Sequence, residues 1–144
     1  MSANSLDLLK ERGFGYDSSL MGNDIPYFVD AEGGRMVELP VHWSLDDAPF
    51  YNYSPVAGRT APMSPPPAVL EAWKWEFDGA YQYGSAFLLT MHPQVTGRLA
   101  KMMVLERIIK YVRAHSDVEF MRCIDVARAW TEEGMRDFES AEAA

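Results

Sequence analysis

The apolar run Ala86–Met91 constrains the fold most strongly. It is entered through Gly84-Ser85 and stopped by Pro93. A run of this length and composition predicts a strand that is buried on both faces of a sheet. His92 follows the run directly, and ligands in α/β folds gather at the carboxyl ends of strands. His92 is therefore the first candidate functional residue.

Composition excludes several classes of protein. The chain has 144 residues, of which 48% are hydrophobic, so its length and apolar content predict one domain with a sizeable core. A net charge of -8 argues against nucleic acid and anionic membranes as partners. The single cysteine, Cys123, excludes an internal disulfide, and no apolar run reaches the length of a membrane span. We expect a cytoplasmic protein.

The N-terminal part of the chain predicts a helix followed by a hairpin. Residues 4–13 carry a polar cap, an apolar stripe and a terminal glycine, which are typical of a short helix. A brief extended segment is expected within 14–20, and strands at Tyr27–Val29 and Met36–Val41 are joined by the turn-rich residues 30–34. No strand precedes the helix, so we expect a fragment of a larger domain.

The remainder alternates between helices and strands. A proline-rich loop with several tyrosines is expected from Pro49 to Pro67, as a lid. Helices are predicted over 67–84, 97–115 and 124–130, a short strand over 118–121, and a fraying tail over 132–144. The inner face of the helix over 67–84 is expected to consist of Leu70, Trp73, Phe77, Ala80 and Gly84. The inner face of the helix over 97–115 is expected to consist of Leu99, Met102, Met103, Leu105, Ile109 and Val112.

This order of elements predicts an α/β protein with parallel strands and crossover helices. A complete (β/α) barrel needs about 250 residues. The predicted fold is therefore a partial (β/α) barrel.

A set of short motifs, in this order and spacing, resembles the polysaccharide deacetylases (carbohydrate esterase family four) and their allantoinase-like branch. The motifs are Asp7-Leu8-Leu9, Gly13-Phe14, Tyr16-Asp17-Ser18-Ser19, Glu38-Leu39-Pro40-Val41, His42-Trp43, Asp46-Asp47, Trp75-Glu76-Phe77-Asp78, Thr90-Met91-His92-Pro93 and Gly97-Arg98. The resemblance implies the C-terminal half of a distorted barrel of about seven strands. The family's earlier motifs, an Asp-Asp with the catalytic base and a His-x-x-x-His of metal ligands, are not matched in this chain.

The resemblance also implies roles for individual residues. His92 matches the histidine that acts as general acid, and the loop from Trp43 to Asp47 matches the one that supplies Asp and Trp to the pocket. We take His92, Asp46 and Asp47 as candidate catalytic residues, one carboxylate orienting the imidazole. The residue-level alternatives are a histidine that binds a backbone carbonyl and an Asx turn at the two aspartates.

Three further residues are candidates for binding substrate. Trp43 could stack on a sugar ring or fill the barrel mouth. Arg98 opposes the dipole at the first turn of its helix, which favours a contact with a carboxylate or substrate. His42 is the third. A metal held by His42, His92 and one aspartate has no supporting spacing, so no metal or other cofactor is predicted in this chain. The resemblance leaves open a divalent metal such as zinc in the intact parent.

The sequence therefore predicts a C-terminal fragment of a deacetylase-like hydrolase that acts on carbon–nitrogen bonds and is inactive alone. The alternatives are a non-catalytic binding or assembly module with half of the fold, and a fragment of an allantoinase-like cyclic amidohydrolase. A half barrel exposes strand edges and apolar core, which predicts a homodimer or higher oligomer that covers the open core. The parent's substrate would be a carbohydrate or another small molecule.

Overall fold

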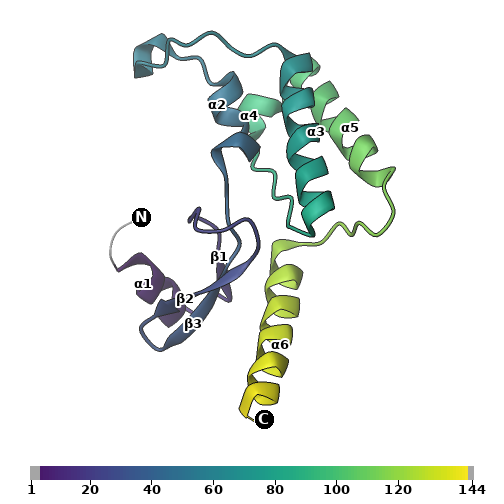
Figure 1. The fold of residues 1–144 in the computed structure, drawn as a ribbon. Helices are drawn as coiled ribbons and strands as arrows, with labels where there is room; N and C mark the ends of the chain where they lie inside the picture. The colour runs from purple at the N-terminus through teal and green to yellow at the C-terminus, as the bar shows by residue number, and fades with distance from the viewer. Residues whose placement is uncertain (1–3, 143–144) are drawn as a thin grey trace. The chain divides into compact units, whose positions relative to one another are not determined.

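The computed structural model of the chain describes residues 4–142 (Figure 1). The chain forms two compact units. The first comprises the residues up to Pro40 together with those from Glu119 onward, and the second comprises Val41–Val118. The architecture is mixed α/β, as expected. No helix in the described range is long and apolar enough to cross a membrane.

The first unit is built on a small mixed sheet. Helix α1 (Ser5–Glu11) is followed by β1 (Tyr16–Asp17), β2 (Tyr27–Ala31) and β3 (Gly34–Glu38), in the sheet order β1-β3-β2. β2 and β3 form the predicted antiparallel hairpin, whereas β1 pairs with β3 in parallel. Helix α6 (Cys123–Glu142) packs against β3. The buried hydrophobic residues of this unit are Met36, Val37, Leu39 and Ala127.

Three expectations for this part of the chain are wrong. Residues 118–121 contain no strand, and α6 extends to Glu142 instead of ending near residue 130. Three of the four residues 118–121 are apolar, but in the described structure the segment has no neighbouring strand with which to form a ladder. β3 likewise ends at Glu38, before Pro40, which cannot donate a ladder hydrogen bond.

Helices dominate the second unit. These are a short 3-10 helix (Trp43–Leu45), α2 (Asp47–Tyr51), a second 3-10 helix (Pro55–Ala57), α3 (Pro66–Tyr83), α4 (Pro93–Thr96) and α5 (Leu99–Arg113). The expected loop from Pro49 to Pro67 therefore contains helical turns. Pro49 is compatible with α2 because the first turn of a helix needs no N–H donor there.

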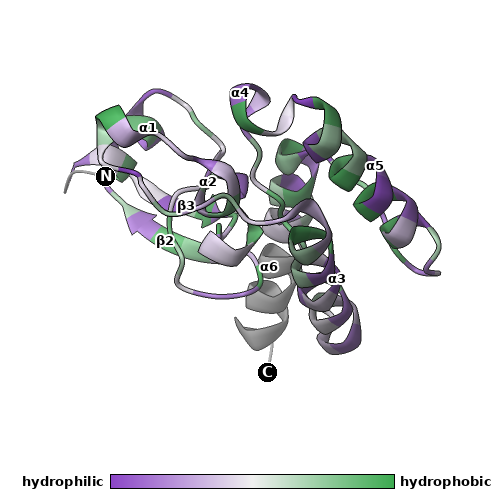
Figure 2. Ribbon diagram, turned by 90° about the horizontal axis from the view of Figure 1, so that it is seen from above, coloured by the Kyte–Doolittle hydropathy of each residue, from purple (hydrophilic) through white to green (hydrophobic). Residues whose placement is uncertain are grey.

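The core of the second unit lies where α3 packs against α5. Figure 2 shows hydrophobic and hydrophilic residues interleaved along both helices, as expected for amphipathic packing. The predicted stripe of α3 is confirmed at Leu70, Trp73 and Phe77, which are all buried. The full buried cluster is Tyr51, Val69, Leu70, Trp73, Phe77, Val95, Val104, Ile108 and Val112.

The predicted inner face of α5 is largely wrong. The buried residues are Val104, Ile108 and Val112, which are spaced four apart, whereas Leu99 is 91% and Met103 51% exposed. The predicted set included neighbouring positions, which point about 100° apart on a helix and cannot share one narrow face. Of that set, Val112 is buried, and the partly buried Leu105 packs against the core cluster.

The predicted buried strand at 86–91 is also wrong. The segment is extended and half-buried, and in the described structure it forms a single parallel bridge, between Thr90 and Asp46. Alternate side chains at Phe87, Leu89 and Met91 pack against the core cluster. The facing segment turns into α2 at Asp47 and so cannot extend the ladder. Apolar sequence thus predicts the burial of these side chains, whereas a strand also requires a partner backbone.

Candidate functional site

The candidate site lies where α2 and α4 begin. Figure 1 shows these two short helices side by side, in agreement with their contacts. Asp46 is the N-cap of α2 and Asp47 its first residue, while His92 is the N-cap of α4. The bridge between Asp46 and Thr90 aligns the two segments, with the Asp47 N–H donating to the Thr90 carbonyl at 3.1 Å. The three predicted catalytic residues are therefore brought together.

The buried Asp47 carboxylate holds His92 from two sides. Its Oδ1 lies 2.6 Å from Nδ1 of the imidazole, and its Oδ2 accepts a hydrogen bond from the His92 backbone N–H at 2.9 Å. The Thr96 hydroxyl donates to the same Oδ2. Both carboxylate oxygens are thus occupied, and the ring is fixed relative to its own backbone. This excludes the alternative in which His92 binds only a backbone carbonyl.

Asp46 has a different role from Asp47. Its Oδ1 accepts a hydrogen bond from the Ala48 N–H at 2.7 Å, which caps α2, and lies 3.8 Å from Nδ1 of His92. The Asx-turn alternative therefore holds for Asp46. Asp47 instead orients the imidazole.

The electrostatics of the site favour a charged imidazole. The hydrogen bond to Asp47 is the main cause that raises the pKa of His92 above its usual 6.5, and the charges of Asp47 and Asp46 add to it. A carboxylate at Nδ1 fixes a proton on that nitrogen and leaves Nε2 for another partner. The His92 side chain is 39% exposed, so the ring can exchange a proton at Nε2 with a ligand.

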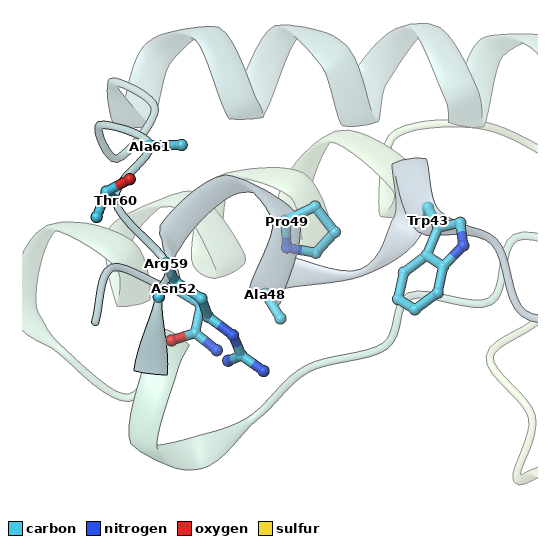
Figure 3. Close-up of a pocket in the computed structure, with 8 residues that line it drawn as sticks. Trp43, Ala48, Pro49, Asn52, Arg59, Thr60 and Ala61 are labelled. Carbon is cyan, nitrogen blue, oxygen red and sulfur yellow. The ribbon is translucent and has the colours of Figure 1, made fainter. Parts of the chain in front are cut away.

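The other predicted residues lie apart from this contact. His42 caps the 3-10 helix, with Nδ1 2.6 Å from the Ser44 hydroxyl. Trp43 is 63% exposed and lines a cavity of about 510 Å³ (Figure 3). Arg98 is the N-cap of α5, and in the described part of the chain its side chain forms no hydrogen bond or ion pair. The expected carboxylate contact of Arg98 is therefore not formed.

Asp46, Asp47 and His92 are the described residues that could together hold a metal, because one ligand atom from each lies within 4.8 Å of the others. The hydrogen bonding does not fit that use. Both Asp47 oxygens already accept hydrogen bonds, one Asp46 oxygen accepts from Ala48, and Nδ1 of His92 faces a carboxylate. A cation would have to displace these donors, so the arrangement suits an oriented imidazole better than a metal.

Sequence reasoning missed two residues near the site. Thr96 lies four positions after His92, one turn along α4, and its buried hydroxyl completes the hydrogen bonding of Asp47. Arg59 lines the same cavity as Trp43. It is the one charged residue between Asp47 and Glu71. That isolation was visible in the sequence and could have identified it.

No protein-family model matches the chain. A peptidoglycan deacetylase of Helicobacter pylori is 26% identical over 84% of this chain and 50% of its own length. A crystal structure described as a polysaccharide deacetylase from Mycobacterium smegmatis matches with a TM-score of 0.88 and 34% identity, over 93% of this chain and 47% of that one. The crystal structure of Puue allantoinase matches with a TM-score of 0.77 and 26% identity, over 90% and 43%. The chain thus spans about half the length of each.

Proposed function

Because this chain is a relative of the polysaccharide deacetylases, as its motifs indicated, we propose that it supplies the general-acid part of an active site that hydrolyses N-acetyl amides. The observation that supports this most directly is the 2.6 Å contact between Nδ1 of His92 and the buried Asp47 carboxylate. The fold proposed with it is the C-terminal half of a deacetylase-like barrel. About half of each relative's length is matched, in keeping with this.

The proposed chemistry follows from the state of the imidazole. In amide hydrolysis water adds to the carbonyl carbon, and the carbon–nitrogen bond then breaks only if the leaving nitrogen receives a proton. His92 carries that proton on Nε2 when it is charged, and Asp47 stabilises the charged form through Nδ1. Asp47 is a positioning residue in this scheme, because its own oxygens are covered by His92 and Thr96.

We propose that the isolated chain is inactive. The family's His-x-x-x-His motif does not occur in it, since its histidines are at 42, 92 and 115. The described cluster of Asp46, Asp47 and His92 is hydrogen-bonded in a way that does not suit a metal. Among the described residues we therefore assign an acid, but neither a metal site nor a base to activate water.

The test is acetate release from an N-acetylated glycan. We expect none from the isolated chain, with or without added zinc. A chimera of the Helicobacter pylori deacetylase, carrying this chain in place of the segment it matches, should release acetate, and His92→Gln should lower the rate at least about 100-fold. His115→Gln is the control, since His115 lies against Phe77 and Tyr111. Turnover by the isolated chain, or an active His92→Gln chimera, would contradict the proposal.

One observation favours a second substrate class. The match to an allantoinase means that a cyclic amide is a candidate for the parent protein. The deacetylase structure from Mycobacterium smegmatis has the higher identity and TM-score, so the N-acetyl substrate is preferred. Assaying the same chimera with allantoin and with an N-acetylated glycan separates the two.

We also propose that the chain associates with a second copy. Leu99, Met102, Met103 and Ile109 expose apolar surface on α5, and burial of such surface drives association. Light scattering at micromolar concentration should give at least twice the monomer mass of 16.3 kDa. A monomer, or a dimer unaffected by Leu99→Glu with Met103→Glu, would contradict this proposal.

A further inference from the structure

The cavity beside α2 has the size of a small-molecule site. Its volume of about 510 Å³ lies within the range of about 300–1,000 Å³ typical of ligand pockets. Figure 3 shows the Trp43 indole at one end, the Arg59 and Asn52 side chains at the other, and Ala48 and Pro49 between them. Gly58, Thr60 and Ala61 complete the lining. An aromatic face and a cation thus lie at opposite ends of a mainly apolar floor.

Trp43 is an exposed ring on a fixed backbone. The next residue, Ser44, accepts a hydrogen bond from the indole N–H of the buried Trp73 at 3.1 Å, which ties this segment to α3. Ser44 is also capped by His42. A tryptophan whose neighbouring backbone is held in this way offers a flat apolar surface, which suits stacking on the face of a sugar ring.

Arg59 is a cation without a charge partner. It forms no ion pair with any other described residue, and no acidic residue lies between Asp47 and Glu71 in an otherwise acidic chain. Its backbone is fixed by two hydrogen bonds with Ser54, each 2.9 Å. Gly58 closes this tight turn at a φ of 71°, in the left-handed region. A guanidinium presented from such a turn is suited to bind a carboxylate.

The cavity adjoins the candidate catalytic pair through its floor. Ala48 lines the cavity, and its backbone N–H is the donor that Asp46 accepts. Asp47, the residue before Ala48, holds His92. The cavity lining and the residue that holds the imidazole are therefore neighbours in the sequence, at the start of α2.

We propose that this cavity binds a pyranose carrying a carboxylate substituent, with the ring stacked on Trp43 and the carboxylate bound by Arg59. Asn52 and Thr60 supply hydrogen bonds to ring hydroxyls or to the amide. The inference deepens the proposed function, on which it rests, by naming the substrate class as an acidic N-acetylated sugar. Its test uses binding alone and therefore does not depend on turnover.

The test compares two probes that differ in one group. N-acetylmuramic acid is N-acetylglucosamine with an added lactyl carboxylate, so the difference in affinity measures recognition of the acid. We expect the acid to bind the full chain about tenfold more tightly, as measured by NMR titration at millimolar sugar. Arg59→Gln should abolish the preference and Arg59→Lys should retain part of it, while Trp43→Ala should weaken both sugars.

Matched controls lie on the same unit. Trp75 is 76% exposed on α3, and Arg107 is exposed on α5, so Trp75→Ala and Arg107→Gln remove the same side-chain types away from the cavity. Neither should change either affinity. Equal affinities for the two sugars, no binding, or an unchanged preference in Arg59→Gln would overturn the proposal. An inactive chimera that keeps the preference would overturn the proposed catalytic role alone, and an active one without the preference would overturn this inference alone.

Discussion

Replacement of Asp47 by Asn should lower the pKa of His92 while leaving the site nearly the same size. The wild-type carboxylate faces Nδ1 at 2.6 Å and stabilises the charged ring through a hydrogen bond and through its charge. An asparagine keeps one acceptor oxygen but carries no charge. We therefore expect the His92 pKa to move down towards the usual 6.5.

The stability cost can be worked from the hydrogen bonds. Asp47 accepts bonds from the His92 ring, the His92 N–H and the Thr96 hydroxyl. Each bond to a charged group contributes about 1.5–3 kcal/mol, and the three share one carboxylate, so they are not additive. Asp47→Ala leaves the buried Thr96 hydroxyl without its acceptor and should lower the free energy of unfolding by about 3–5 kcal/mol, and Asp47→Asn by about 1–3 kcal/mol.

The pH dependence has a definite sign. A histidine whose pKa is raised in the folded state contributes stability that is complete below its unfolded pKa of about 6.5 and is lost as the pH rises through the higher folded value. The contribution of this group to the free energy of unfolding of the wild type should therefore fall between pH 6 and pH 8, with the release of about one proton. Asp47→Asn should lack this fall.

The assay is an NMR titration of the histidine ring protons, supported by urea unfolding at each pH. His42, whose ring contacts the Ser44 hydroxyl and no carboxylate, is an internal control in the same spectra. If His92 titrates at the same pH in Asp47→Asn as in wild type, the Asp47 carboxylate does not raise the pKa of His92.

Three shorter predictions concern the rest of the chain. Burial, with the neighbouring Asp17 carboxylate, raises the pKa of Glu38 from 4.5 to about 7. The free energy of unfolding should therefore fall by up to about 3 kcal/mol as the pH rises from 4.5 through 7. Glu38→Gln should remove that dependence, as measured by urea unfolding at pH 5 and 8. Ile108→Ala should cost about 3–4 kcal/mol and Met103→Ala under about 1 kcal/mol, and equal losses would contradict the observed face of α5. Gly58→Ala, at a φ of 71°, should cost about 1 kcal/mol by thermal unfolding.

Local chemistry predicted much of the fold. The hairpin was predicted from strand-forming residues around a Gly-Gly turn, and α3 from a stripe that includes Trp73. These elements depend on interactions close in sequence. The inner face of α5 did not follow from the sequence, because apolar residues occupy several faces of the helix and only packing on α3 selects Ile108 over Met103.

The candidate site was predictable in its members but not in its arrangement. His92 was found because it ends an apolar run, and the resemblance added a role for it. Which aspartate contacts the ring could not be decided from adjacent residues, since both positions suit a cap or an ion pair. The helix start decides it: Asp46 caps α2, and Asp47, one residue further, faces the ring.

The absence of a ladder at 86–91 changes how the position of His92 must be explained. A strand would have fixed the histidine through paired neighbours, but in the described structure this segment has one bridge, at Thr90. The helices on either side are also short, since α2 has five residues and α4 has four, and helices of that length are not stable alone. The Asp47 carboxylate therefore joins two elements that could not persist separately. The same contacts that set the protonation of His92 also hold α2 and α4 together, so we expect the chemistry and the local stability of the site to be lost together.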